Sequence, residues 1–490
     1  MFDSSIELDP PAELASTPKP TSLLAAAPAL VALSLAMLVE MVDNSVLNVA
    51  LPTIGRDLHS GTSGLQWIIS AYSLTFGALL LVGGSLGDRL GRRRVLQWGL
   101  LGFAASGALV LFVHSTGALI GVRAASGACA ALIAPGTMSL MFRLFDDDEL
   151  RARAISIIVV VAMTGFAIGP AVSGLAITHV PWQVLLLANT PMALVAWLGV
   201  RRGIAADDPA ELRAGGADLP GAALSVSAIA LGLYAFTLAV EDGWMATTTL
   251  ACAAAAVVAG VGFVLRERRT PRPMLDLHLF ANPTVRGSAL LQTTSMLAMV
   301  GVVFASTQLF QFAWGWTPLR AGLATLPIVI GMLTAMPVAD VLVRRLGHRR
   351  GAALGSALLI AALLLLATTI PVGYPPVAVA MFVISAAMRL VMVTCAVDLL
   401  DALPQDQTSI GAALNDSAQE LGSTVGVAVV GTIIAALVGT TLPTDIWPAA
   451  FTADFTHALQ VAFVVLAAIT LTIAVIGIRT LTDSKTVEEH

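Results

Sequence analysis

The chain contains 490 residues, of which 57% are hydrophobic and 12% are charged. Because about a quarter of the residues in a soluble domain are charged, this composition excludes an ordinary soluble protein and indicates an integral membrane protein. The net charge of −5 excludes no class of partner, since the charges of a membrane protein are divided between its two sides.

The first segment, residues 1–24, is acidic and rich in proline, with no basic stretch ahead of an apolar core. We therefore expect a disordered cytoplasmic tail and not a cleaved signal peptide. The three cysteines, Cys129, Cys252 and Cys395, all lie in apolar segments. Their positions predict neither a disulfide framework nor a metal site.

Apolar segments follow one another along the rest of the chain, and each is close to the ~20 residues that cross a membrane as a helix. An even number of such segments would place both termini on the same side of the membrane. Hydropathy predicts fourteen spans, at roughly residues 26–50, 65–84, 95–113, 117–141, 154–177, 182–200, 219–240, 249–265, 286–312, 318–342, 351–370, 375–398, 410–437 and 457–478.

The basic residues decide which side the termini occupy. Of the 26 lysines and arginines, only Arg56 and Arg320 fall in loops on one side, while Arg123 and Arg389 lie within spans. All the others lie in the opposite loops and in the tails. Because cytoplasmic loops carry an excess of lysine and arginine, both termini are predicted to be cytoplasmic.

The loop between the second and third spans has an unusual composition. Residues 84–96 read GSLGDRLGRRRVL, and Asp88 is placed to cap a helix end or to pair with a neighbouring cation. One interpretation is a basic loop that only sets orientation. The spacing G-x-L-x-D-R-x-G-R-R-x-x-L, however, resembles the helix 2–3 signature of the major facilitator superfamily, with Gly87 in place of the usual alanine. This resemblance implies a role in conformational gating for Gly84, Asp88, Arg89, Gly91 and Arg92.

A weaker copy of this loop occurs in the second half of the chain. Residues 344–350 (RRLGHRR) echo residues 88–94 (DRLGRRR), and each follows the second span of a group of six. The repeat predicts an all-α membrane protein with two pseudo-symmetric six-helix halves around a central cavity, as in the major facilitator fold. The two additional spans resemble the fourteen-helix branch of drug:proton antiporters. We place the boundaries at 25–202 for the N-terminal half, 203–275 for the linker with two extra helices, 276–479 for the C-terminal half and 480–490 for a cytoplasmic tail.

Ionisable residues within the predicted spans are the main functional candidates, because a charge at the bilayer centre costs at least about 2.5–3.5 kcal/mol. No histidine lies deep in a span, so a transported proton would have to bind to carboxylate groups. An unpaired carboxylate in an apolar cavity has a raised pKa and can exchange protons near neutral pH. Alternatively, these residues form permanent ion pairs, such as Asp43–Arg123, that only fix helix packing. They are Glu40, Asp43, Arg123, Arg389, Asp416 and Glu420.

Two of these residues lie in recognisable patterns. Residues 43–52 (DNSVLNVALP) resemble the signature L-D-x-T-V-x-N-V-A-L-P of the fourteen-helix antiporters, with Ser45 for threonine and Val42 for leucine. The resemblance implies that Asp43 is the proton-coupling acid, while a role of Glu40 stays open. Residues 119–127 (LIGVRAASG) resemble the helix 4 signature, with serine where glutamine is usual. In that family the arginine, here Arg123, stabilises or tunes the proton-bearing acid.

The fifth span carries a glycine–proline pattern. Residues 165–174 (GFAIGPAVSG) resemble the antiporter signature G-x-x-x-G-P-x-x-G-G, with one serine as a departure. Glycines four residues apart allow close helix contact, and a proline kinks a helix. A tight packing seam explains the glycines as well as a functional role does. In the superfamily the motif marks exporters, and it consists here of Gly165, Gly169, Pro170 and Gly174.

The thirteenth span places Asp416 and Glu420 on one helical face. Drug exporters of this branch have acids at similar places, where they help to accept cationic drugs. With Arg389, the two acids form a candidate substrate site or second proton site. Five large apolar residues of the ninth span either line a cavity for lipophilic ligands or face lipid: Met296, Met299, Phe304, Phe310 and Phe312.

The sequence has no nucleotide-binding loop, metal-ligand cluster or catalytic triad, so we expect neither enzyme activity, nor a cofactor, nor a nucleic-acid partner. We predict a monomeric, proton-coupled antiporter of the bacterial inner membrane that exports lipophilic, cationic drugs or dyes by alternating access. One alternative is a dedicated exporter of a single product, such as an antibiotic, lipid or siderophore. A second alternative, a membrane enzyme or receptor on a helical scaffold, is disfavoured by the missing catalytic residues and by the repeated loop.

Overall fold

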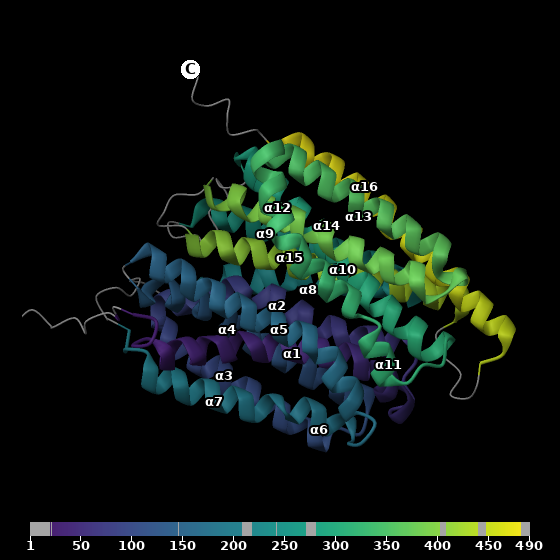
Figure 1. Ribbon diagram of the computed structural model, residues 1–490, viewed down its shortest axis with the longest axis horizontal. Coiled ribbons are helices and arrows are strands. Elements are labelled where there is room, and N and C mark those ends of the chain that lie inside the picture. Colours follow the sequence, from purple (N-terminus) through teal and green to yellow (C-terminus); the bar gives the residue numbers. More distant parts are fainter. Residues whose placement is uncertain are drawn as a thin grey trace, which may run out of the picture.

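Helices make up the regular secondary structure of the part of the chain that the computed structural model describes (Figure 1). Apolar segments form helices in a membrane because a helix satisfies its own backbone hydrogen bonds where water is absent. A helix, or two helices in line, occupies each of the predicted spans. The described residues are 20, 22–145, 147–207, 218–241, 243–270, 281–401, 408–439 and 447–481.

The helices follow the order of the predicted spans. The first six spans correspond to α1 (Ala27–Asp57), α2 (Thr62–Leu90), α3 (Arg92–Leu109) with η1 (Val110–Phe112), α4 (Thr116–Leu144), α5 (Asp148–Ala176), and the pair α6 (Trp182–Leu187) and α7 (Asn189–Gly203). The linker contains α8 (Leu219–Glu241) and α9 (Thr247–Arg269). The last six spans correspond to α10 (Pro283–Gln308) with the π-helical η4 (Leu309–Ala313), the pair α11 (Pro318–Leu323) and α12 (Leu326–Leu346), α13 (His348–Thr369) with η5 (Ile370–Val372), α14 (Tyr374–Asp401), α15 (Thr408–Val438) and α16 (Ala449–Thr480).

The number of membrane spans is supported in part. Within the described residues, eleven helical segments are long and apolar enough to cross a membrane. A twelfth is added if the two parts of α2, which are bent by 47° between Leu80 and Val82, count as one span. The count of fourteen spans and the domain boundaries therefore stay predictions.

The helices pack in two sets whose pairings correspond. In the first set α1 packs on α5 and α7, α2 packs on α4, and α3 packs on α4 and α7. In the second set α10 packs on α15 and α16, α12 packs on α14, and α13 packs on α14 and α16. Because the paired helices hold equivalent places in the order of spans, the packing agrees with the repeat seen in the two loop sequences.

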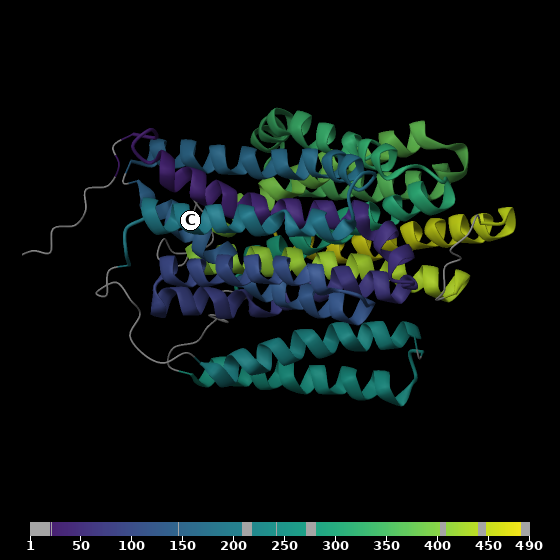
Figure 2. The same cartoon turned by 90° about the horizontal axis from the view of Figure 1, so that it is seen from below.

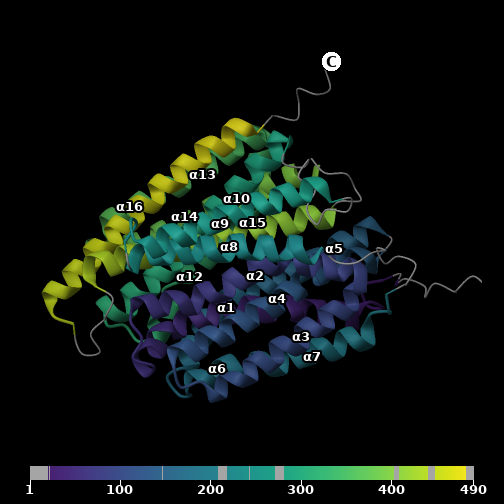
Figure 3. The same cartoon turned by 180° about the vertical axis from the view of Figure 1, so that it is seen from behind.

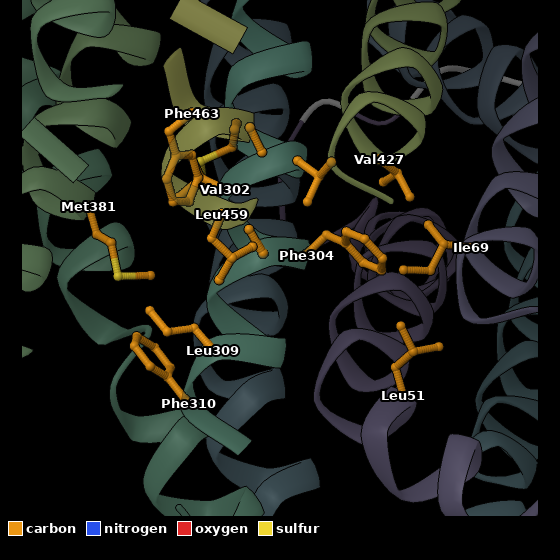
Figure 4. Packing of buried hydrophobic residues seen from close by; sticks show 14 of the residues in the cluster. Leu51, Ile69, Val302, Phe304, Leu309, Phe310, Met381, Val427, Leu459 and Phe463 are labelled. Carbon is orange, nitrogen blue, oxygen red and sulfur yellow. The ribbon is translucent and has the colours of Figure 1, made fainter. Parts of the chain in front are cut away.

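A buried apolar core joins the two sets. Figure 4 shows the ring of Phe304, from α10, directed toward Leu51 of α1 and Ile69 of α2, with Val427 of α15 nearby. Helix α10 contacts α1, α14, α15 and α16, so it is surrounded by protein. All five large residues predicted to line a cavity or to face lipid belong to this core or pack against it: Met296, Met299, Phe304, Phe310 and Phe312. Core packing, which neither alternative proposed, is therefore their role in this conformation.

Helices α8 and α9 form a hairpin beside the two sets. Helix α9 packs on α8, and α8 packs on both α2 and α15, so the hairpin lies along the join between those two helices (Figure 3). Figure 2 shows it along one edge of the molecule. Asp218, just before α8, accepts hydrogen bonds from Nε of Arg266 and from the backbone N–H of Gly221, both at 3.1 Å. Burial alone would raise the pKa of Asp218, but these hydrogen bonds outweigh burial and hold that pKa below its ordinary value.

Candidate functional site

Both carboxylate oxygens of Asp43, on α1, accept hydrogen bonds. Nη1 of Arg123, from α4, donates to Oδ2 and forms a buried ion pair. Nδ2 of Asn189, the first residue of α7, donates to Oδ1 at 2.6 Å. The three side chains are buried. Asp43 and Arg123 therefore lie in contact in this conformation, as the ion-pair alternative requires.

Arg123 also contacts α2. Its Nε donates to the backbone carbonyl of Ile68 at 3.4 Å, and its guanidinium group lies 4.5 Å from the ring centre of Tyr72. Its Nη2 has no hydrogen-bond partner within the described residues. The arginine thus connects α1, α2 and α4, and one of its N–H groups stays available for a further acceptor.

Charged residues from both sets of helices lie near Tyr72 of α2. Gly77, in the next turns of α2, leaves room for Glu420 of α15, because a Cβ at Gly77 would lie 3.2 Å from Cβ of Glu420. The structure therefore brings an acid of the thirteenth predicted span to the same region as Asp43. The charged residues that act electrostatically on Tyr72 include Glu40 and Asp43 of α1, Arg123 of α4 and Glu420 of α15.

Arg389 is half-buried on α14, and one residue that contacts the site was missed by the sequence patterns. The side chain of Asp416 lies outside the described residues. Asn189 carries no charge and belongs to none of the patterns discussed above. Its signal in the sequence is an amide within the otherwise apolar residues 184–194 (VLLLANTPMAL).

The loop between α2 and α3 depends on a glycine and on a distant aspartate. Gly91 has a φ of 101°, a backbone conformation that favours glycine. Nη2 of Arg92 donates to Oδ1 of Asp88 at 2.8 Å, so Asp88 pairs with a cation, which is one of its two predicted roles. The helix cap is Asp207, which follows α7 and accepts a hydrogen bond from the backbone N–H of Arg93 at 3.1 Å. A Cβ at Gly91 would lie 2.3 Å from Oδ2 of Asp207, so the cap also requires glycine there.

Two other residues of the loop signature, Gly84 and Arg89, lie in the second half of α2. A Cβ at Gly84 would meet the side chain of Pro135 in α4 at 3.9 Å, an ordinary contact. Arg89 is half-buried in the last turn of α2. Gly347, between α12 and α13, has a φ of 80° and thus repeats the left-handed turn of Gly91 in the second set of helices.

The glycine–proline pattern of α5 lies where the two sets of helices touch. Gly165 faces α1, and a Cβ there would lie 2.2 Å from the side chain of Leu38. A Cβ at Gly174 would lie 2.5 Å from the carbonyl oxygen of Pro318, at the start of α11. Gly169 is buried in the same helix. The pattern therefore lets α5 approach α1 on one side and α11, of the other set, on another.

A small cavity lies beside this contact. Its volume of about 30 Å³ suits one water molecule. Nearby, Nε2 of Gln311, in the π-helical η4, donates to the carbonyl of Val49 at 2.9 Å and links α10 to α1. A backbone contact and a hydrogen bond thus join the two sets at this level. The cavity is lined by Asn48, Val49, Pro170, Val303, Thr307, Thr325, Ile328 and Val329.

Solved structures share this architecture. The chain is similar to a bacterial homologue of the human lysosomal transporter Spinster, in an inward-facing and unoccupied conformation, with a TM-score of 0.68 and 13% identity over 93% of this chain and 97% of that chain. It is also similar to the peptide transporter POT in complex with sulfate, with a TM-score of 0.64 and 16% identity over 92% of this chain and 95% of that chain. At these identities the likeness shows the fold alone.

Sequence relatives cover most of the chain. It is 34% identical to the multidrug efflux pump LfrA of Mycolicibacterium smegmatis over 411 residues, which are 83% of this chain and 81% of the relative. It is 30% identical to the methylenomycin A resistance protein of Streptomyces coelicolor over 408 residues, 82% of this chain and 84% of that protein. It is 29% identical to the tetracenomycin C resistance and export protein of Streptomyces glaucescens over 440 residues, 90% of this chain and 81% of that protein.

The family assignment follows from the whole chain. Residues 33–427 and 288–490 match the Major Facilitator Superfamily. These matches include the helices that carry Asp43, Arg123 and Glu420, and both copies of the left-handed turn between helices. The chain belongs to the major facilitator superfamily of membrane transporters.

Proposed function

We propose that the protein is a proton-coupled antiporter that exports lipophilic, cationic drugs or dyes from the cytoplasm by alternating access. Its relatives include a multidrug efflux pump and proteins that confer resistance to single antibiotics. The observation that carries the proton coupling is the buried carboxylate of Asp43, bound by Arg123 and Asn189.

Protonation of Asp43 changes the forces between helices. As a carboxylate, Asp43 binds the guanidinium group of Arg123 and so holds α1 against α4. Once protonated, it is neutral, and the ion pair is lost. A buried cation without its partner is costly, so Arg123 then favours an arrangement in which it reaches water or another acceptor. Proton binding is in this way linked to helix movement.

The region around Tyr72 is suited to a cation. Glu40, Asp43 and Glu420 supply three carboxylates there, beside the guanidinium group of Arg123. A desolvated carboxylate attracts a lipophilic cation strongly. The stacked rings of Tyr72 and Phe76, whose centres are 5.9 Å apart, add an aromatic surface. Because Glu420 and Asp43 belong to different sets of helices, a cation bound between these two acids would contact both sets.

Alternating access requires the contacts between the two sets to break and re-form. We assign the α5–α11 contact and the bond from Gln311 to Val49 to the outer side of the membrane, with both termini in the cytoplasm of a bacterial cell. In this orientation the contacts at Gly174 and Val49 close the outer side, and proton binding at Asp43 helps to change which side is open.

Export of one dedicated product is a second candidate function. Two of the relatives are named for resistance to a single antibiotic, methylenomycin A or tetracenomycin C, and one of these is also named as an export protein. A transporter with this role would need the same proton site but a more selective substrate site. The two functions therefore differ in the range of compounds moved and not in the source of energy.

Proteoliposomes test the proposal. An imposed pH gradient should drive tetraphenylphosphonium, a lipophilic cation, across the membrane without any nucleotide. Asp43→Asn, which is nearly isosteric, should abolish this movement and leave the protein in the membrane. Asp57→Asn is a matched control at the C-terminal end of α1, where Asp57 accepts a hydrogen bond from Trp182, and it should transport normally.

Each other outcome has a definite meaning. If Asp43→Asn transports at the wild-type rate, Asp43 is not the coupling acid and Glu40 becomes the candidate. If the wild-type protein moves none of a panel of unrelated lipophilic cations but does move one antibiotic, the dedicated exporter is correct. If a pH gradient drives no compound at all, proton-coupled export is wrong.

A further inference from the structure

Asn189 contacts the candidate proton site but lies outside every sequence pattern that suggests it. Its Nδ2 donates to Oδ1 of Asp43 at 2.6 Å, while Oδ2 of the same carboxylate is bound by Arg123. Asn189 is buried, and its own Oδ1 has no hydrogen-bond partner within the described residues. In this orientation the amide makes one hydrogen bond, and that bond stabilises the charged form of Asp43.

The position of Asn189 is fixed by the neighbouring helix α3 and not only by Asp43. The hydroxyl of Thr190 donates to the carbonyl of Ala104 at 2.9 Å. Gly107 of α3 permits this approach, because a Cβ there would lie 2.6 Å from the Thr190 hydroxyl. The start of α7 is thus held against α3, and Asn189 presents a donor to Asp43 from a fixed position.

The charged groups near Asp43 come from several of the described helices. Arg123 of α4 is in contact with it, Glu40 lies one turn earlier on α1, and Tyr72 of α2 and Glu420 of α15 lie in the same electrostatic group. In the described parts of α5, α7 and α10, the charged residues lie in the first two turns or in the last turn. Asn189 is therefore the neutral donor to a site whose other near members are ionisable.

We propose that Asn189 is a positioning residue for proton coupling, which weakens proton binding at Asp43 by donating to the charged carboxylate. Because Arg123 occupies Oδ2, the incoming proton binds Oδ1 and displaces the hydrogen bond from Asn189. Proton loading therefore breaks this hydrogen bond between α1 and α7 as well as the ion pair between α1 and α4. This inference rests on the proposed function in taking Asp43 as the acid that carries the proton.

Infrared spectroscopy of the purified full-length protein tests the inference without any substrate. The carbonyl band of a protonated carboxyl group that Asp43→Asn removes identifies Asp43, and its intensity against pH gives the midpoint of protonation. Asn189→Leu removes the donor at similar volume, and Asn189→Ala removes it with less bulk. Both should move the midpoint to higher pH by about one unit, which is about a tenfold gain in proton affinity.

Ser106→Ala is the control for general loss of a buried hydrogen bond. Ser106 of α3 and Ser126 of α4 share a hydrogen bond of 2.9 Å that does not involve Asp43. This variant should titrate like the wild-type protein. An unchanged or lowered midpoint in both Asn189 variants would overturn the inference, and so would an equal shift in Ser106→Ala.

The outcome is separable from that of the proposed function. The infrared midpoint reports the effect of Asn189 on Asp43 whether or not the protein transports anything. If Asp43→Asn still exports under a pH gradient, the coupling role of Asp43 fails even when the midpoint shifts as expected. If coupling holds and the midpoint does not move, the role of Asn189 alone fails.

Discussion

The carbonyl oxygen of Pro170 packs directly against Gly322 and leaves no space for a Cβ there. A Cβ at Gly322 would be 2.2 Å from that oxygen, a distance that real Cβ atoms essentially never show. Pro170 belongs to α5 and Gly322 to α11, so this contact joins the two sets of helices backbone to backbone. Since the nearest atoms are backbone atoms, an added methyl group can be accommodated only if the helices separate.

Gly322→Ala should therefore disfavour the conformation described here. Overpacking of this kind costs about 1–3 kcal/mol, which shifts a two-state equilibrium about 5- to 150-fold. A reporter cysteine at Val329, which lines the neighbouring cavity, should react faster with a membrane-impermeant maleimide from outside. Gly121→Ala is the control, because a Cβ added there would meet no atom within 4 Å outside its own stretch of helix backbone. Equal labelling rates for Gly322→Ala and Gly121→Ala would contradict the expectation.

Asp207 and Gly91 should stabilise the protein through one shared contact. Asp207→Ala removes the cap of α3 and should lower the free energy of unfolding by about 0.5–2 kcal/mol. Gly91→Ala should cost more, because alanine is strained at a φ of 101° and its Cβ would meet the Asp207 carboxylate. Thermal unfolding in detergent measures both. The double variant should lose less than the sum of the two, and strict additivity would show that the contact is not shared.

Asp88→Asn should slow the exchange between inward- and outward-facing states without changing substrate affinity. It weakens the ion pair from Asp88 to Arg92, which lies at the junction of α2 and α3 and away from Tyr72. Maleimide labelling of a reporter cysteine at Val329 should report the slower exchange, and equilibrium binding of tetraphenylphosphonium should stay the same. If substrate binding became tenfold weaker while the turnover rate stayed the same, Asp88 would act in substrate binding and not in the exchange between states.

Glu420→Gln should reduce export of cations, divalent ones most, and affect neutral compounds less. The reason is its position beside Gly77 of α2, in the group of acids around Tyr72. Transport rates for matched cationic and neutral probes in proteoliposomes measure the difference. Equal loss for both classes would assign Glu420 to proton coupling, where a second proton adds about 2.3 kcal/mol per 100 mV of membrane potential. No loss for either class would make it a structural residue.

The linker hairpin should loosen in acid. Hydrogen bonds hold the pKa of Asp218 below its ordinary value, so the stability that Asp218 contributes is present above about pH 3.9, the unfolded value, and is lost as the pH falls through the lower folded pKa. Hydrogen exchange at the start of α8 should rise in that window. Asp218→Asn should exchange faster already at neutral pH and show no further step in acid. An unchanged acid step in this variant would assign the loosening to another group.

Hydropathy located the helices because lipid requires long apolar segments, but it could not assign their buried faces. Phe304 lies on α10 and Phe310 on η4, which continues it, and α10 is surrounded by other helices and has no polar face to reveal its orientation. The sequence did suggest Asp43 and Arg123 as the two members of an ion pair, because charged residues within spans are rare. The number of spans and the domain boundaries stay predictions.

The contacts that the sequence did not reveal are made by residues that look ordinary. Asn189 is a neutral amide in an apolar segment, and Asp207 is one acid among several in a polar connection. Each acts on a residue far away along the chain, on Asp43 and on the backbone of Arg93. Without the packing of α7 against α1 and α3, nothing in their local sequence separates them from neighbouring polar residues.

The hairpin of α8 and α9 gives the protein two unlike flanks. On one flank α8 lies over the join between α2 and α15, while α5 and α11 of the two sets meet directly elsewhere. A solute dissolved in the bilayer diffuses toward the protein from every direction, but at the α2–α15 join it meets a covering helix first. The direction from which a lipophilic compound approaches within the plane of the membrane thus decides whether it can pass directly from lipid to the boundary between the two sets.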